Sequence, residues 1–113
     1  MAEWIYFIHP PREDFAATMT AAEAAVWDAH WARLKRLHTD GLVILAGPTL
    51  GPHNTGIMVF EAPDEVAART IMADDPIAVG GWAEVELRPF RVSLLRGRPS
   101  DPSARHYDGR HAR

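Results

Sequence analysis

Apolar side chains gather along the chain in short runs that proline, glycine and polar residues separate. Residues 4–8, 42–46 and 57–61 are such runs, rich in β-branched and aromatic side chains, and they predict three strands. A longer strand is predicted over residues 83–95. Its apolar positions change from odd to even numbers across Pro89, so we expect a β-bulge or a bend there.

The first helix is predicted between the first two strands. After a polar loop over residues 12–19, Thr20 and Glu23 form a capping-box pattern, in which each side chain can accept a hydrogen bond from the other residue's backbone N–H. We expect this helix to end near Asp40, because Gly41 is placed for the left-handed conformation that stops helices.

The second helix is predicted between the third and fourth strands. Pro63 suits its first position, and the acidic residues 64–65 suit its positive end. The helix should stop before Pro76, because the residue that precedes a proline avoids helical geometry.

This order of elements, βαββαβ, is the ferredoxin-like arrangement. It predicts an α+β fold with a four-stranded antiparallel sheet and two helices on one face. Segments 4–8, 42–46 and 57–60, however, are apolar at every position and lack the alternation of a sheet with one face in water. Because two helices cover only one face, we expect a second copy of the protein to cover the other. The sequence therefore predicts a homodimer through the open sheet face.

Length and charge divide the chain into a domain and a tail. The 113 residues suit one domain, which we place at residues 1–95, and residues 96–113 have the composition of a flexible basic tail. The net charge of −3 divides into −6 for the domain and +3 for the tail. An acidic domain argues against nucleic-acid binding.

Several classes of protein are excluded by what the sequence lacks. It has no cysteine, which excludes a thiol nucleophile, disulfides and cysteine-ligated metals. No apolar run approaches the roughly 20 residues of a membrane span, and the first residues lack the basic region of a signal peptide. We therefore expect a cytoplasmic protein without membrane contact.

One histidine lies in an unusual place on the first helix. On a helical wheel at about 100° per residue, His30 falls within the apolar stripe between Leu37 and Leu34, and His38 falls near its edge. A buried imidazole needs hydrogen-bond partners. Two interpretations remain open: a core histidine bonded to a backbone carbonyl, and a functional histidine.

A pair of aspartates is the second unusual feature. Asp74 and Asp75 stand where the second helix ends, and carboxylates there are disfavoured by about 0.3–1 kcal/mol each. They could form an Asx turn before Pro76 or a surface pair with Arg69. Alternatively, one aspartate pairs with a histidine, fixes its tautomer and raises its basicity. Because both helices pack on the same face, such a contact is feasible.

Other candidate motifs are weaker. The remaining histidines share no metal-ligand spacing, so no metal site is predicted. Residues 47–52 are rich in glycine but lack the Lys-Ser/Thr of a phosphate loop, and a turn is expected there. Trp27 and Trp31 lie four residues apart on one helix face, which favours core packing over a stacking platform.

In chain order, a series of short motifs resembles the YCII-related (YciI-like) proteins, over about residues 3–95. The motifs are Met19-Thr20 through Glu23, His30-x3-Leu34-x2-Leu37, Gly41 leading to Ala46-Gly47-Pro48, Phe60-Glu61-Ala62, Ala67-Ala68, Asp74-Asp75-Pro76, Gly80-Gly81 and Glu86-Leu87-Arg88-Pro89-Phe90. The succession of the histidine, the Ala-Gly-Pro and the Asp-Pro motifs is the most specific part.

The resemblance implies a protein of the dimeric α/β-barrel superfamily with a ferredoxin-like protomer and an active site. The family's histidine falls on His30, and its Asp-Pro aspartate falls on Asp75 and not on Asp74. This pair is regarded as a candidate catalytic dyad, and one branch of the family is linked to dehydrochlorination of chlorinated hydroxyquinols. The first strand ends in His-Pro-Pro at residues 9–11, where many relatives carry other polar residues, so this rim of the pocket is not transferred.

The leading hypothesis is a small enzyme without cofactor or metal, with His30 as general acid/base and Asp75 as its orienting partner. A small, aromatic or enol-bearing substrate would lie near Leu34 and the Gly47-Pro48 turn and undergo elimination, dehydrochlorination or isomerisation. The alternatives are a non-catalytic dimer that binds or senses a metabolite in the same pocket, and a cofactor-free monooxygenase-like protein.

Overall fold

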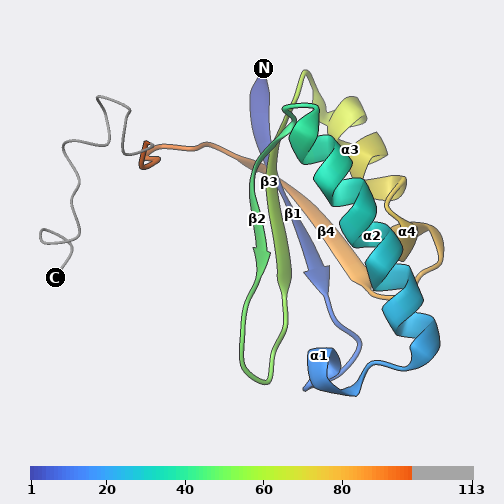
Figure 1. Cartoon of the computed structure of the whole chain (residues 1–113). Helices are drawn as coiled ribbons and strands as arrows, with labels where there is room; N and C mark the ends of the chain where they lie inside the picture. Colours follow the sequence, from blue (N-terminus) through green and yellow to red (C-terminus); the bar gives the residue numbers. More distant parts are fainter. Residues whose placement is uncertain (98–113) are drawn as a thin grey trace, which may run out of the picture.

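The computed structural model describes residues 1–97, which form one antiparallel sheet with helices on one face (Figure 1). The strands follow the order β2-β3-β1-β4. The elements in chain order are β1 (Ala2–His9), α1 (Phe15–Thr18), α2 (Ala21–Thr39), β2 (Val43–Pro48), β3 (Gly56–Ala62), α3 (Glu65–Ala73), α4 (Pro76–Val79) and β4 (Glu84–Phe90). The predicted α+β, ferredoxin-like arrangement is confirmed.

The long helix α2 has the limits that its sequence predicts. The Thr20 side chain accepts a hydrogen bond from the Glu23 backbone N–H, and the Glu23 side chain accepts one from the Thr20 backbone N–H. At the other end Asp40 caps the helix, and Gly41 has a φ of 86°, which is the left-handed conformation that glycine tolerates best. The predicted capping box and glycine stop are confirmed.

The second predicted helix differs from expectation at its start. Pro63 does not occupy the first helical position, because the helix α3 begins at Glu65. Asp64 is the N-cap instead, and its Oδ1 accepts a hydrogen bond from the Ala67 backbone N–H at 2.9 Å. The side-chain cap decides where the helix begins, and the proline stands just before it.

The predicted long strand over residues 83–95 with a bulge at Pro89 is wrong. β4 ends at Phe90, and its pairing with β1 runs in unbroken register from Glu84 to Phe90. The apolar positions change parity because Val85 and Leu87 lie on one face of the sheet and Phe90 on the other. An irregularity does occur in the sheet, between Val43 and Leu45 of β2.

The core lies between the sheet and the helices. Trp4, Tyr6 and Ile8 of β1 are buried on the helix side, and partly buried apolar residues of α2 pack against them. The intervening β1 residues Ile5 and Phe7 lie on the opposite side of the sheet, with intermediate exposure. The apolar residues of the helical stripe therefore face the sheet, as the wheel predicts.

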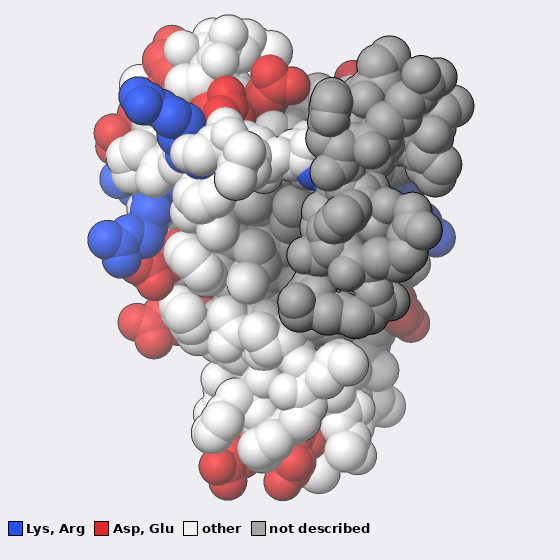
Figure 2. Space-filling view, turned by 90° about the vertical axis from the view of Figure 1, so that its left-hand side faces the viewer, with Lys and Arg blue, Asp and Glu red and all other residues white. Residues whose placement is uncertain are grey.

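We call the side of the sheet without helices the outer face. It carries apolar side chains of the first three strands, and β4 contributes charged side chains and Phe90: Ile5, Phe7, Leu45, Ile57, Val59, Glu86, Arg88 and Phe90. Leu45 is 48% exposed and Phe90 43%. In Figure 2, which views the molecule from the side of β2, the part of the visible surface that belongs to described residues is mainly uncharged, with charged side chains toward its margins.

Two short helices were not expected. α1 forms inside the segment predicted as a polar loop, and α4 begins at Pro76, which was predicted only to end the preceding helix. The predicted tail, residues 96–113, lies almost entirely outside the described residues. No helix within residues 1–97 is both long and apolar enough to cross a membrane.

Candidate active site

A cavity of about 240 Å³ opens between the helix side of the sheet and the helices α1 and α2. Its lining is mostly apolar and aromatic. The lining residues are Tyr6, Ile8, Phe15, Ala16, Met19, Trp27, His30, Trp31, Leu34, Gly47, Pro48, Asn54, Gly56, Ile57 and Met58. Because an apolar cavity of about 150 Å³ accommodates benzene, this cavity has room for a single substituted ring.

His30 is the titratable imidazole in the wall of this cavity. Its Nδ1 lies 2.7 Å from Oδ2 of Asp75, and the side chains are 15% and 4% exposed. An ionised carboxylate only accepts hydrogen bonds, so Nδ1–H donates to Asp75 and the lone pair of a neutral ring resides on Nε2. Within residues 1–97, Nε2 of His30 has no protein partner. This nitrogen is available to a molecule in the cavity.

Asp75 is held in place by the backbone that follows it. It is the N-cap of the short helix α4, and its Oδ1 accepts a hydrogen bond from the Ile77 backbone N–H at 2.9 Å. Pro76 occupies the first turn, where its missing N–H is not needed. The expectation that both aspartates close the second helix is therefore wrong for Asp75, because its carboxylate lies at the start of a new helix; Asp74 is the C-cap of α3.

The structure distinguishes between the turn, the arginine pair and the histidine pair that the sequence left open for the two aspartates. Asp75 forms the turn before Pro76 with one oxygen and contacts His30 with the other. Arg69 does not pair with either aspartate, since its Nε lies 2.8 Å from Oε2 of Glu65. His30 likewise bonds a carboxylate and not a backbone carbonyl.

Arg33 is a basic residue beside this pair that the sequence did not single out. Its Nη2 donates to the Ile71 carbonyl oxygen at 2.9 Å, and its Nη1 lies 3.8 Å from Oδ2 of Asp75. The helical wheel placed Arg33 on the polar side of the helix. Its side chain is long enough for the guanidinium to reach α3 and Asp75. Tyr6 was also missed, because it looks like any core residue of an apolar strand.

The other residues predicted to line the pocket all contact the cavity: Leu34 of α2, and Gly47 and Pro48. Gly47 and Pro48 do not form a turn, however. They belong to β2 and pair with Ile57 and Gly56, so they form the wall of the cavity at the sheet edge. The chain turns only after them, because the pairing with β3 continues through Pro48.

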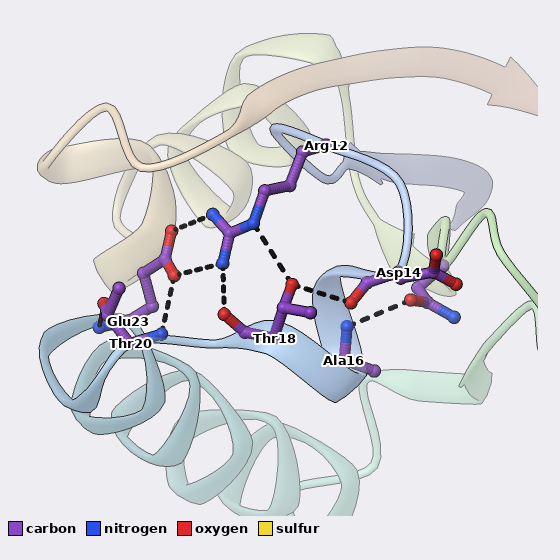
Figure 3. Close-up of polar contacts among 7 residues, drawn as sticks. Arg12, Asp14, Ala16, Thr18, Thr20 and Glu23 are labelled. Atoms are coloured by element: carbon purple, nitrogen blue, oxygen red, sulfur yellow. Dashed lines mark hydrogen bonds and ion pairs between the residues drawn. The ribbon is translucent and has the colours of Figure 1, made fainter.

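Polar contacts hold α1 in place at the rim of the cavity (Figure 3). Both terminal nitrogens of Arg12 contact the Glu23 carboxylate, at 2.8 and 2.9 Å, and Nε of Arg12 donates to Thr18 Oγ1 at 3.2 Å. The Ala16 backbone N–H donates to Asn54 Oδ1 at 3.0 Å. These contacts join α1 to the start of α2 and to the loop between β2 and β3.

The remaining histidines lie elsewhere or outside the described residues. His9 stacks on Phe7 and lies 3.0 Å from Glu86 on the outer face, and His38 is exposed on α2. His106 and His111 lie beyond residue 97. Within the described part of the chain, no three side chains of the metal-ligating kinds gather at one place.

Fold and site together define a ferredoxin-like α+β protein, with a small apolar cavity and a histidine–aspartate pair in contact at its wall. The chain belongs to the YCII-related domain family, whose pattern matches residues 4–91. The family resemblance of the sequence motifs is confirmed.

A similar solved structure is the 5-chloro-2-hydroxyhydroquinone dehydrochlorinase from Burkholderia phenoliruptrix, in complex with 2,5-dihydroxybenzoquinone. The two share 19% sequence identity with a TM-score of 0.60, over 80% of this chain and 94% of that chain. At this identity, the similarity shows the common fold. No curated protein matches this chain in sequence.

Proposed function

We propose that the protein is a small-molecule enzyme in which His30 is the general acid/base and Asp75 its orienting partner. The observation that carries the proposal is the 2.7 Å contact between His30 Nδ1 and Asp75 Oδ2 at the wall of an apolar cavity. A general base must lie within hydrogen-bond reach of the proton that it removes. Nε2 of His30 meets this condition for a molecule bound in the cavity.

The proposed chemistry is elimination, with isomerisation as the related reaction. Nε2 accepts a proton from the substrate, and the electron pair left behind forms a new double bond. In an elimination, the bond to the leaving group breaks and that group departs with its electron pair as an anion. In an isomerisation, the imidazolium returns the proton to another carbon. Asp75 stabilises the imidazolium in both cases.

The cavity favours a small, flat and partly apolar substrate. Its volume of about 240 Å³ suits one substituted ring, and Trp27, Trp31 and Phe15 supply aromatic walls. The similar structure is a dehydrochlorinase that holds a dihydroxybenzoquinone. A chlorinated, hydroxylated ring is therefore the substrate class that we propose first.

Chloride release from 5-chloro-2-hydroxyhydroquinone tests this proposal. We expect turnover by the wild type and a loss of about 10²–10⁴-fold in kcat for His30→Gln, as for the removal of a general base. Asp75→Asn should also lose activity, because an amide NH₂ can hold the imidazole in the wrong tautomer. Asparagine caps helices as well as aspartate, so this variant keeps the start of α4.

Leu37→Met is a matched control on the same helix, because Leu37 packs against the core but does not line the cavity. It should keep wild-type turnover. Unchanged turnover in both site variants would contradict the proposal. A ring compound that binds tightly and is recovered unaltered would favour the non-catalytic binding alternative, and oxygen consumption during turnover would favour the monooxygenase-like alternative.

We further propose that the protein is a homodimer through its outer face. The support is chemical: Ile5 and Phe7, which have intermediate exposure, present apolar surface on a side of the sheet that no helix covers. Leu45 and Phe90 extend this surface and are roughly half exposed. A second copy, with the same apolar face, is the occupant that this surface suits.

A further inference from the structure

The strands contribute two neighbouring rows of paired residues to the cavity. In the first, which we call the Tyr6 row, Tyr6 of β1 pairs with Met58 of β3. In the second, the Gly56 row, Ile8 of β1 and Pro48 of β2 both pair with Gly56, the first residue of β3. All five residues line the cavity. Directly paired residues project to the same face of a sheet, so Gly56 is the one residue of these rows without a side chain on the cavity side.

The backbone does not require a glycine at this position. Gly56 has no positive φ, and its pairing with both neighbouring strands is regular. A Cβ at Gly56 would have its three nearest heavy atoms in the side chain of Ile8, at 3.5–3.9 Å. These are ordinary van der Waals distances, so an alanine fits here without strain.

A glycine in a strand therefore needs another explanation at this place. Glycine weakens a strand, because it loses more conformational freedom on folding than other residues and packs no side chain. Where it occurs in a strand, it marks a bulge, a bend, or the close approach of another backbone or of a ligand. The regular pairing of Gly56 excludes a bulge and a bend, and the three nearest neighbours of its Cβ position are side-chain atoms. The close approach of a ligand is the reason that remains.

We propose that Gly56 is a specificity-determining residue, whose missing side chain leaves room for a substituent on the bound ring. The inference rests on the proposed function, since it takes the cavity as the substrate site. Successive residues on one face of a strand lie roughly 7 Å apart, a spacing comparable to the length of one aromatic ring. A ring beside the Tyr6 row therefore extends its substituent over the Gly56 row.

The substituent that suits this place is apolar. The side chains beside Gly56 in its row are those of Ile8 and Pro48, and within residues 1–97 the cavity lining contains no lysine, arginine, aspartate or glutamate. Asn54 also lines the cavity, but its amide NH₂ donates to carbonyl oxygens of its own loop and its Oδ1 accepts from the Ala16 backbone N–H. A chlorine atom or a small alkyl group fits such surroundings, whereas a carboxylate would lose its hydration without gaining a partner.

The test compares the binding of hydroquinone and of chlorohydroquinone to the wild type and to Gly56→Ala. Dissociation constants come from NMR titrations that follow the indole N–H signals of Trp27 and Trp31, which line the cavity. One methyl group in an apolar pocket changes discrimination by about 10–200-fold. We therefore expect Gly56→Ala to bind chlorohydroquinone about tenfold or more weakly and to keep the affinity for hydroquinone within about twofold.

Gly47→Ala is the matched control on the neighbouring strand. Gly47 pairs with Ile57 on the outer face, and a Cβ there would have no heavy atom within 4 Å. This variant adds the same methyl group to the sheet but on the side away from the cavity. It should keep the wild-type affinity for both compounds.

Several results would overturn the inference. In Gly56→Ala these are an equal loss of affinity for both compounds or an unchanged ratio of the two dissociation constants, and so is the same change in Gly47→Ala. A wild type that binds neither compound would contradict it as well. An unfolded Gly56→Ala would show that the fold itself requires the glycine. Because this experiment measures binding alone, the loss of turnover in His30→Gln tests the proposed function separately.

Discussion

At the level of single residues, the two carboxylate oxygens of Asp75 have different partners, one in the backbone and one in the candidate site. One oxygen caps α4 through Ile77, and the other contacts His30. The cap fixes the side chain in one rotamer, so the oxygen that meets the imidazole is held by the backbone rather than by a flexible chain. Arg33, anchored on the Ile71 carbonyl, offsets the buried charge from the side of α2. The position of the pair is thus a consequence of local helix capping.

At the element scale, the contact between Arg12 and Glu23 joins α1 to α2 and shapes one rim of the cavity (Figure 3). The hydrogen bonds from Arg12, followed by the Thr20 backbone N–H, lower the pKa of Glu23 from 4.5 to about 2. The folded chain therefore keeps Glu23 ionised at a pH where the unfolded chain has already bound a proton. A lowered pKa stabilises the fold above the unfolded value, and this stabilisation is lost as the pH falls toward the folded value.

Glu23→Gln should accordingly lower the thermal unfolding midpoint by a constant amount above pH 4.5. The difference from the wild type should then shrink as the pH falls from 4.5 to about 2. Thermal unfolding followed by circular dichroism across this range measures it. Glu65→Gln is the control, since its exposed pair with Arg69 on α3 should contribute little. A difference for Glu23→Gln that stays constant down to pH 2 would show that the ion pair does not form.

Elements with local start and stop signals could be predicted from the sequence. The capping box at Thr20 and the glycine at residue 41 determine α2 by contacts within a few residues, and so its limits were predictable. Pro76 was misleading because proline is compatible both with the end of one helix and with the first turn of the next. The start of α4 depends on Asp75 bonding Ile77, which places the carboxylate at the positive end of a helix.

The candidate site was predictable only in part. The periodicity of α2 placed His30 among apolar residues, and the family resemblance selected Asp75 from two neighbouring aspartates. Tyr6 and Arg33 could not be selected in this way. A strand pattern indicates which face a residue occupies but not which residue of another element lies above it. The place of Tyr6 in the cavity wall depends on the packing of α2 over β1, and the approach of Arg33 to Asp75 depends on the contact of α2 with the start of α4. These elements are distant in sequence.

At the scale of the whole molecule, the proposed dimer depends on the outer face. Leu45→Glu places a charge on this face, at a position that is 48% exposed in the single chain and therefore tolerates the change without unfolding. Burying an unpaired charge at an interface costs about 3 kcal/mol or more, which weakens a dimer about a hundredfold. Light scattering with size-exclusion chromatography should show a dimer for the wild type and a monomer for this variant.

Val66→Glu is the control for surface charge alone. Val66 is 76% exposed on α3, on the helix side of the molecule, so this variant should remain dimeric. A wild-type protein that is monomeric at micromolar concentration would contradict the proposed dimer. Dissociation of both variants would show that added charge, and not the outer face, controls assembly.

The proposed reaction depends on Asp75 holding His30 with its proton on Nδ1 and with Nε2 free toward the cavity. Long-range proton–nitrogen NMR of histidine-labelled protein measures the tautomer of a neutral imidazole directly. We predict that neutral His30 carries its proton on Nδ1, because the Asp75 carboxylate accepts it at 2.7 Å. Asp75→Asn should shift the population toward the other tautomer. A neutral His30 with its proton on Nε2 in the wild type would contradict the proposed role of the pair.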